Sequence, residues 1–189
     1  MLLEEQEYAL VARATQRDAD AFSQLYRLYF DRIYRYARLK LANDADAEDL
    51  TSAVFFNAWR MIDRFSPRGD TSFAAWLFRL AHNALIDRYR RERTMVSLDD
   101  DHPPLTPAEI LPGPDVLLEK RMTLTELRDA LQTLTEEQRE VVLLRFVEGL
   151  SAREVGDIMG KQEGAVRGMQ FRAIEALRRA LGQGGGSIL

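Results

Sequence analysis

The chain of 189 residues contains no cysteine, which excludes disulfides and thiolate metal sites and fits a reducing compartment. Its two histidines, His82 and His102, lie in different contexts and form no ligand cluster. No apolar run approaches the roughly 20 residues of a membrane span, and the acidic start lacks the basic region of a signal peptide. We therefore expect a cytoplasmic protein without a membrane span, a metal or another cofactor.

Proline is rare except in one segment. Five of the six prolines fall between residues 103 and 114, and residues 94–119 hold six acidic residues without a Lys or Arg. Because proline lacks a backbone donor and restricts the residue before it, this segment cannot be one continuous helix. We predict an extended acidic, Pro-rich linker at 94–122 between two helical domains, with a passive tether as the simplest interpretation.

The sequence before the linker predicts helices throughout, because no segment alternates long enough for a strand. Asn43 or Asp44 is expected to cap the third helix, and Asp70 or Thr71 the fourth. Apolar residues recur at helical spacing within 18–41: Phe22, Leu25, Tyr26, Tyr29, Ile33, Tyr36 and Ala37.

The most distinctive block is 44–93, where an acidic helix is followed by an aromatic and basic one. In the second helix, Phe73, Leu77, Leu80 and Ala84 predict a buried stripe. A neighbouring face suits phosphate contact, base stacking and base-edge hydrogen bonds, and comprises Ser72, Trp76, Arg79, Asn83, Asp87 and Arg90. The alternative is that Trp76 belongs to the core and that the arginines form a solvated face.

The C-terminal part predicts a helix-turn-helix. Capping boxes begin at Thr135 and Ser151, and Gly149 and Gly160 end the helices that follow. The first of these helices is expected to run through Val141, Val142, Leu144 and Phe146, and Val155, Ile158 and Met159 of the second are expected to face inward. A last helix is expected at 162–181, before a glycine-rich tail at 182–189; an ordinary helical hairpin is the alternative.

The last helix is the predicted DNA reader. Arg167 and Gln170 lie three residues apart, as major-groove readers do, whereas Lys161 and Arg172 are better placed for phosphates. The other exposed candidates are Gln162 and Arg178. Because the net charge is −4, we expect weak DNA binding by the chain alone and a requirement for a partner.

Two sets of residues resemble a known family. The first set resembles region 2 of a bacterial RNA polymerase sigma factor and comprises Asp46, Ala47, Glu48, Asp49, Leu50, Phe55, Ala58, Trp59, Arg60, Phe73, Trp76, Leu77, Ala81, Asn83, Asp87, Arg90 and Arg91. The second set resembles region 4 and comprises Leu134, Gln138, Val141, Val142, Leu143, Leu144, Gly149, Leu150, Ser151, Glu154, Val155, Gly164, Ala165, Val166, Arg167, Arg172 and Ala173. With these two regions alone, the chain resembles the extracytoplasmic-function (ECF) group of the sigma-70 family.

The resemblance implies an all-α protein without catalytic activity that directs core RNA polymerase to promoters and assists melting. Its domains would be 1–93 for docking and the minus-10 element, 123–181 for the minus-35 element, and 182–189 as a flexible tail. Polymerase would be bound by Asp46, Glu48, Asp49, Asn57 and Trp59. The minus-10 element would be bound by Arg64, Phe65, Ser72, Trp76, Arg79, Asn83, Arg90 and Arg91, and the minus-35 element by Lys161, Gln162, Arg167, Gln170, Phe171 and Arg172.

The chain departs from the family pattern at two places. Thr51, Ser52 and Ala53 replace the common Gln-Glu, which predicts reduced polymerase contacts there. Ala165 and the pair Gly168 and Met169 replace polar readers, which predicts a weak or unusual minus-35 preference. An anti-sigma protein is left open as a partner, beside core polymerase and promoter DNA.

Two other function classes are weighed. A stand-alone helix-turn-helix regulator would need neither the acidic helix nor the aromatic and basic one. An enzyme is disfavoured because His82 and Asp87 lie five apart, a poor spacing for a catalytic pair on a helix, and no phosphate loop or metal-ligand spacing occurs.

Overall fold

A computed structural model describes residues 2–41, 43–66, 71–96 and 131–183. The described residues are helical and contain no strand, which confirms the all-α prediction. The chain divides into two compact units, Met1–Thr106 and Pro107–Leu189, and each is treated by itself. The predicted linker at 94–122 and the tail at 182–189 lie almost wholly outside the described residues.

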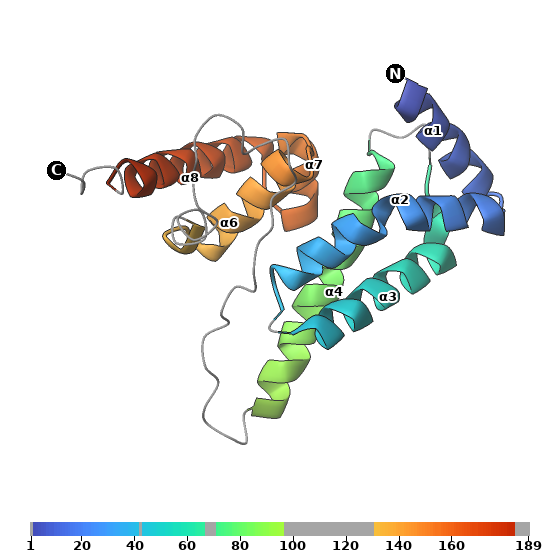
Figure 1. Cartoon of the computed structure of the whole chain (residues 1–189), viewed down its shortest axis with the longest axis horizontal. Helices are drawn as coiled ribbons and strands as arrows, with labels where there is room; N and C mark the ends of the chain where they lie inside the picture. The colour runs from blue at the N-terminus through green and yellow to red at the C-terminus, as the bar shows by residue number, and fades with distance from the viewer. Residues whose placement is uncertain (1, 42, 67–70, 97–130, 184–189) are drawn as a thin grey trace. The chain divides into compact units, whose positions relative to one another are not determined.

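The described residues of unit 1 form four α-helices: α1 (Leu2–Ala14), α2 (Ala19–Arg38), α3 (Asp44–Met61) and α4 (Phe73–Val96). A short 3-10 turn, η1 (Ile62–Arg64), follows α3. Helix α2 packs against α1, α3 and α4, and α3 also packs against α4 (Figure 1). This arrangement brings the acidic start of α3 and the basic end of α4 into one unit.

Side-chain caps fix where these helices begin. At α2, the Asp18 carboxylate accepts hydrogen bonds from the amides of Asp20 and Ala21. At α3, the Asn43 side chain accepts one from the amide of Asp46, so Asn43 is the cap of the two candidates, Asn43 and Asp44. At α4 the predicted cap at Asp70 or Thr71 is wrong in position, because Ser72 Oγ accepts the bond from the Ala75 amide at 3.1 Å. The serine hydroxyl lies three residues before that amide, which is the normal cap geometry.

The core of unit 1 is rich in aromatic rings. Tyr36 and Phe78 are fully buried and meet edge to face with ring centroids 5.5 Å apart. Tyr29 meets Phe73 at 5.3 Å. Edge-to-face pairs of this kind contribute beyond the area they bury.

The predicted buried stripe of α4 needs correction. In α4 the buried row after Phe73 and Leu77 continues through Ala81 and Leu85, while Leu80 and Ala84 are only half-buried. Side chains four residues apart form the ridges by which helices pack against one another. In α4 the buried residues follow this spacing of four and not the alternating spacing of four and three that was predicted. In α2, Tyr26 is 39% exposed because its ring covers Phe55 from outside, with centroids 4.6 Å apart.

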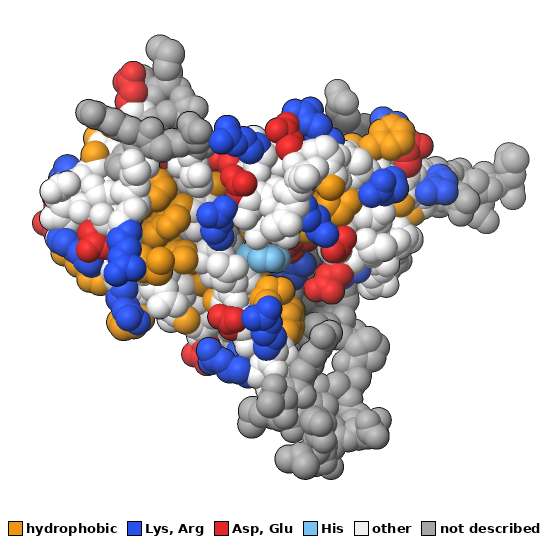
Figure 2. Space-filling view, turned by 180° about the vertical axis from the view of Figure 1, so that it is seen from behind, with side chains coloured by type: hydrophobic (Ala, Val, Ile, Leu, Met, Phe, Trp, Pro, Cys, Tyr) orange, Lys and Arg blue, Asp and Glu red, His pale blue; other side chains and the backbone are white. Residues whose placement is uncertain are grey.

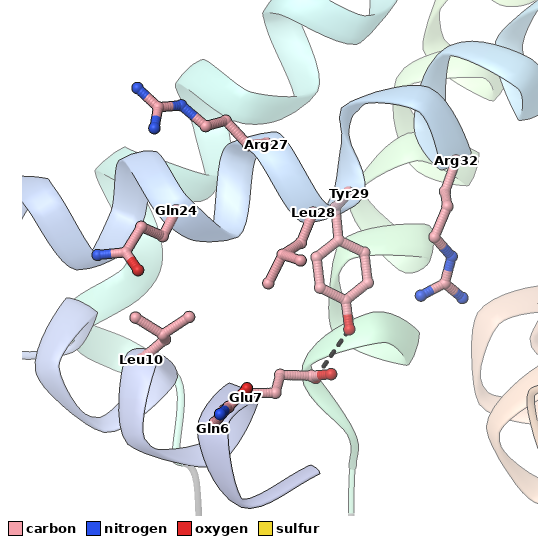
Figure 3. A pocket seen from close by; sticks show the side chains of 8 residues that line it. All are labelled: Gln6, Glu7, Leu10, Gln24, Arg27, Leu28, Tyr29 and Arg32. Carbon is pink, nitrogen blue, oxygen red and sulfur yellow. Dashed lines mark hydrogen bonds between the residues drawn. The ribbon is translucent and has the colours of Figure 1, made fainter. Parts of the chain in front are cut away.

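A groove lined by polar and apolar side chains lies between α1 and α2. Its lining includes Leu10, Leu28 and Arg27, and at one end the Tyr29 hydroxyl donates to Glu7 at 2.7 Å (Figure 3). The Arg32 guanidinium lies 4.8 Å from the centre of the Tyr29 ring. Burial, followed by the Glu7 hydrogen bond, raises the pKa of Tyr29.

Unit 2 contains α6 (Glu136–Val142), α7 (Ala152–Met159) and α8 (Glu163–Gln183). Both predicted capping boxes are present, at Thr135 with Gln138 and at Ser151 with Glu154. Helix α6 continues as a π-helical segment, η2 (Leu143–Val147). Within this segment Phe146 is 51% exposed, and Glu148, just after it, is buried. Met159, predicted to face inward, is half-buried.

Candidate polymerase and nucleic-acid interfaces

The first turns of α3 present an acidic face. Glu48 and Asp49 are exposed, whereas Asp46 is half-buried and forms an ion pair with Arg88 of α4 at 2.7 Å. Asn43 also donates to the Asp46 carboxylate at 2.9 Å. Glu48 and Asp49 are therefore the more accessible of the predicted polymerase-binding carboxylates, while Asp46 ties α3 to α4.

The far end of α3 is held by Arg17, which sequence reasoning missed. Arg17 donates to the carbonyls of Trp59 and Arg60 at 2.6 and 3.2 Å and to Asp63 at 2.8 Å. It adopts a left-handed conformation, with φ 65°, between α1 and α2. Helix ends leave carbonyls without partners, and the guanidinium supplies donors for them.

Trp59 is thereby fixed in place. Its half-buried ring packs on Phe22 with centroids 5.0 Å apart, and the Arg17 guanidinium lies 5.6 Å from its centre. The Arg17 hydrogen bond is the main reason that the pKa of Asp63 is lowered. Asn57, the other predicted contact on α3, is also half-buried.

Three aromatic rings gather at the start of α4. Phe65 meets Trp76 at 5.2 Å and Phe73 at 5.8 Å, and Phe73 meets Trp76 at 5.6 Å. Phe73 is buried, whereas Phe65 and Trp76 are half-buried. Trp76 is thus both a packing residue and a partly accessible ring, so the two interpretations of it from sequence are not exclusive.

Polar and basic residues continue along α4. Asn83, Arg90 and Arg91 are exposed, and Arg79 is half-buried. Arg90 lies 3.9 Å from Asp87 in an exposed pair. Arg64 and Ser72, at the two ends of the connection between η1 and α4, are exposed as well.

On the face drawn in Figure 2, exposed hydrophobic side chains gather in patches bordered by Lys and Arg side chains.

The helix-turn-helix of unit 2 depends on two glycines. Gly160 ends α7 in the left-handed conformation, with φ 65°. A Cβ at Gly156 would lie 2.5 Å from the Lys161 carbonyl oxygen, so only glycine permits this close approach. Val155, Ile158, Val166 and Met169 are buried between α7 and α8.

The predicted readers of the last helix occupy different environments. Gln162, Arg167, Phe171 and Arg172 are exposed. Lys161 pairs with Glu137 at 2.8 Å. Gln170 is half-buried and accepts a hydrogen bond from Arg145 Nε at 3.1 Å, while Arg145 also donates to the Leu150 carbonyl.

Gln170 is therefore tied to Arg145, whereas Arg167 is exposed. Sequence reasoning also missed Glu163, whose carboxylate accepts two hydrogen bonds from Arg167. The spacing of four on a helix was the signal that could have found this pair.

Comparison with protein families matches the two units separately. The model of Sigma-70 region 2 matches residues 25–94, and that of Sigma-70, region 4 matches residues 130–179. The chain belongs to the sigma-70 family. It is a transcription initiation factor of the ECF sigma class, the class that brings RNA polymerase to promoters, and family members generally act without catalysis of their own.

Curated relatives place the chain in the ECF group. It is 38% identical to the ECF sigma factor BldN of Streptomyces coelicolor, over 91% of this chain and 64% of that protein. It is 31% identical to the ECF sigma factor SigW of Bacillus subtilis, over 90% of this chain and 94% of that protein. The chain thus spans nearly all of SigW but less than two thirds of BldN.

Solved structures support the fold. CnrH, in complex with the cytosolic domain of CnrY, is 26% identical with a TM-score of 0.65, covering 94% of this chain and 98% of its own. RpoE of Bartonella quintana, in complex with the anti-sigma factor NepR, is 25% identical with a TM-score of 0.69, covering 85% of this chain and 96% of its own.

Two features are absent from the described residues. No group of three or more His, Cys, Asp or Glu side chains there could hold a metal ion. None of the helices there is long and apolar enough to cross a membrane.

Proposed function

We propose that the chain binds core RNA polymerase through α3 and carries it to promoters that it recognises with α4 and α8. The observation that carries this proposal is the match of two sigma regions, in order, to two separate units. Unit 1 holds an acidic and an aromatic-basic surface, and unit 2 holds a helix-turn-helix. Since both core polymerase and the chromosome are cytoplasmic in bacteria, this role places the protein in the cytoplasm.

Docking is assigned to the exposed carboxylates of α3. Glu48 and Asp49 offer negative charge to a basic partner surface, and Trp59, braced by Arg17, offers a rigid ring at the other end of the helix. Charge complementarity of this kind speeds association and fixes its register. Asp46 and Asn57 would contribute at the edge of this contact.

Recognition and melting of the minus-10 element are assigned to the start and outer face of α4. Phe65 and Trp76 are accessible rings on which an extruded base can stack, at a gain of roughly 1–3 kcal/mol per base. Ser72 and Asn83 offer hydrogen bonds to bases, and Arg64, Arg79, Arg90 and Arg91 offer positive charge to phosphates.

Recognition of the minus-35 element is assigned to α8. Arg167 and Phe171 project from its exposed side, Gln162 lies just before its first turn, and Lys161 and Arg172 offer charge to phosphates. Because Gln170 is bound to Arg145, its contribution requires that this hydrogen bond be shared or broken.

An anti-sigma protein is a proposed partner as well. The similar RpoE was solved in complex with the anti-sigma factor NepR, and the two chains match over most of their lengths. Such a partner would have to cover the surfaces of α3, α4 or α8 named above.

Run-off transcription tests the whole proposal. Sigma-free bacterial core polymerase is mixed with genomic fragments, with and without the chain. We expect defined transcript starts that appear only with the chain and share a promoter sequence. Specific DNA binding by the chain alone, without any transcript, would instead identify a stand-alone regulator.

A further inference from the structure

We propose that Glu163 is a positioning residue for promoter reading, which holds the Arg167 guanidinium in the orientation that reads a guanine. This inference rests on the proposed function, because it concerns the minus-35 element read by α8. The pair joins the first residue of α8 to the residue one turn later. Glu163 was not among the residues predicted to act in recognition.

The geometry of the pair leaves the reading edge of Arg167 available. One oxygen of Glu163, Oε1, accepts from Nε of Arg167 at 2.9 Å and from one Nη at 2.5 Å. Both bonds use the side edge of the guanidinium. The end edge, which carries one N–H from each Nη, remains to donate in parallel to N7 and O6 of guanine.

The surroundings of Arg167 make this brace more important. A Cβ at Gly164 would meet nothing within 4 Å, and at Gly168 only the end of the Arg172 side chain. The outward turns beside Arg167 therefore hold little side-chain bulk to confine it. Arginine loses much rotamer freedom when it is fixed, and a brace formed before binding reduces that loss.

The Glu163 carboxylate that favours base discrimination also lowers the overall affinity for DNA. Glu163 places a negative charge where the phosphates of the duplex approach, and charge of that sign weakens binding to any DNA sequence. An exposed ion pair contributes little to folding, so removal of the carboxylate should leave unit 2 folded. The inference therefore predicts a paired change: discrimination falls while general affinity stays equal or rises.

The chain provides a matched control on the same helix. Glu175 pairs with Arg178 at 2.9 Å, and the side chains of that pair are 43% and 73% exposed. The corresponding values for Glu163 and Arg167 are 43% and 70%. Glu175→Gln removes the same charge from the same kind of pair, three turns further along α8.

The experiment measures transcription by the reconstituted holoenzyme on a library in which every minus-35 position is randomised. Arg167→Ala first identifies the base pair that Arg167 reads, as the position at which preference is lost. At that base pair we expect Glu163→Gln to lower discrimination about three- to tenfold, part of the full value of a bidentate contact. Glu175→Gln should leave it unchanged.

A second variant separates geometry from charge. Glu163→Asp keeps the negative charge but shortens the side chain by one methylene, so it should also lose discrimination without a gain in general affinity. Full discrimination with Glu163→Asp, or unchanged discrimination with Glu163→Gln, would overturn the positioning role. Loss of preference at a different base pair would overturn it too, since Glu163 would then contact a base itself. Failure of the unmodified chain to select any promoter would instead reject the proposed function.

Discussion

The two units are both small helical folds with a surface proposed to bind a partner, but different interactions hold them together. Unit 1 relies on interlocking rings and on ties between residues far apart in the chain, such as Arg17 with Asp63 and Arg88 with Asp46. Unit 2 relies more on local devices, two capping boxes and a left-handed glycine, beside two side-chain ties between its elements, Lys161 with Glu137 and Arg145 with Gln170. Loss of a ring or a tie in unit 1 should therefore disturb several elements at once, whereas loss of a capping box in unit 2 should disturb mainly one helix.

The largest effect is expected on polymerase binding by unit 1. Asp49→Arg places a cation on the docking face of α3, and like charges at an interface cost several kcal/mol, so affinity for core polymerase should fall about a hundredfold or more. Asp49 is exposed, so the fold should persist. Binding is measured by titration of labelled core polymerase. Asp31→Arg, the same charge change on exposed α2 surface, is the control, and equal losses in both variants would reject the docking face.

The aromatic core of unit 1 can be tested by Phe78→Ala. Phe78 is fully buried, so this substitution should lower the free energy of unfolding by about 3–5 kcal/mol. Both tryptophans of the chain, Trp59 and Trp76, lie in unit 1, so their fluorescence follows this unit in urea. Phe56→Ala, at a ring 64% exposed, should change little. A comparable loss at Phe56 would show that burial does not set the contribution of these rings.

The close approach in unit 2 predicts a smaller loss for Gly156→Ala. The new methyl would clash with the Lys161 carbonyl, and overpacking of this kind costs about 1–3 kcal/mol. Circular dichroism should show loss of helix at lower urea, with tryptophan fluorescence unchanged. Gly164→Ala, where the methyl meets open space, should be neutral or stabilising. A destabilised Gly164→Ala would contradict the helix-turn-helix geometry.

The capping box of α7 predicts a loss of about 1 kcal/mol for Ser151→Ala, since its hydroxyl satisfies the Glu154 amide. Ser52→Ala, at an exposed position inside α3, provides the control, and urea denaturation followed by circular dichroism measures both. If both variants unfold at the same urea concentration as the unmodified chain, the capping box does not stabilise unit 2.

The smallest effect concerns pH. The pKa of Asp18 is lowered, first by the Ala21 amide and then by Arg13, and that of Asp63 by Arg17. Because both pKa values lie below the ordinary 3.8, the stabilisation is complete above that pH and is lost as pH falls through the folded-state values. The urea concentration at the unfolding midpoint, followed by tryptophan fluorescence, should therefore fall in acid. It should fall less steeply for the double variant Asp18→Asn and Asp63→Asn. Identical acid profiles would contradict these assignments.

Sequence patterns predicted the local features of the fold well. The capping residues Asn43, Thr135 and Ser151 and the turn glycine Gly160 act within a few residues, so spacing alone identifies them. The buried row of α4 was partly mistaken because spacing does not say which ridge packs inward. The π-helical segment η2 was not predicted because no sequence pattern marks one.

The site was predictable in part for the same reason. Exposed carboxylates on α3 and exposed arginines on α8 lie where the motifs place them. The roles of Arg17 and Arg145 depend on contacts across elements, with Trp59 42 residues away and Gln170 25 residues away, which one sequence does not reveal. Docking and recognition by the named residues remain predictions.

The π-helical segment η2 has a consequence for the history of this fold. A π turn accommodates one residue more than an α turn, so it is the expected trace of a single-residue insertion into a regular helix. Removing one residue between Leu143 and Val147 should let the segment rewind as an α-helix while the residues after it keep nearly the same direction, because the π turn already absorbs the extra residue. Relatives that lack the insertion should therefore carry one residue fewer between Leu143 and Glu148. The length of this helix, compared across the family, would show whether the exposed ring of Phe146 accompanies the extra residue.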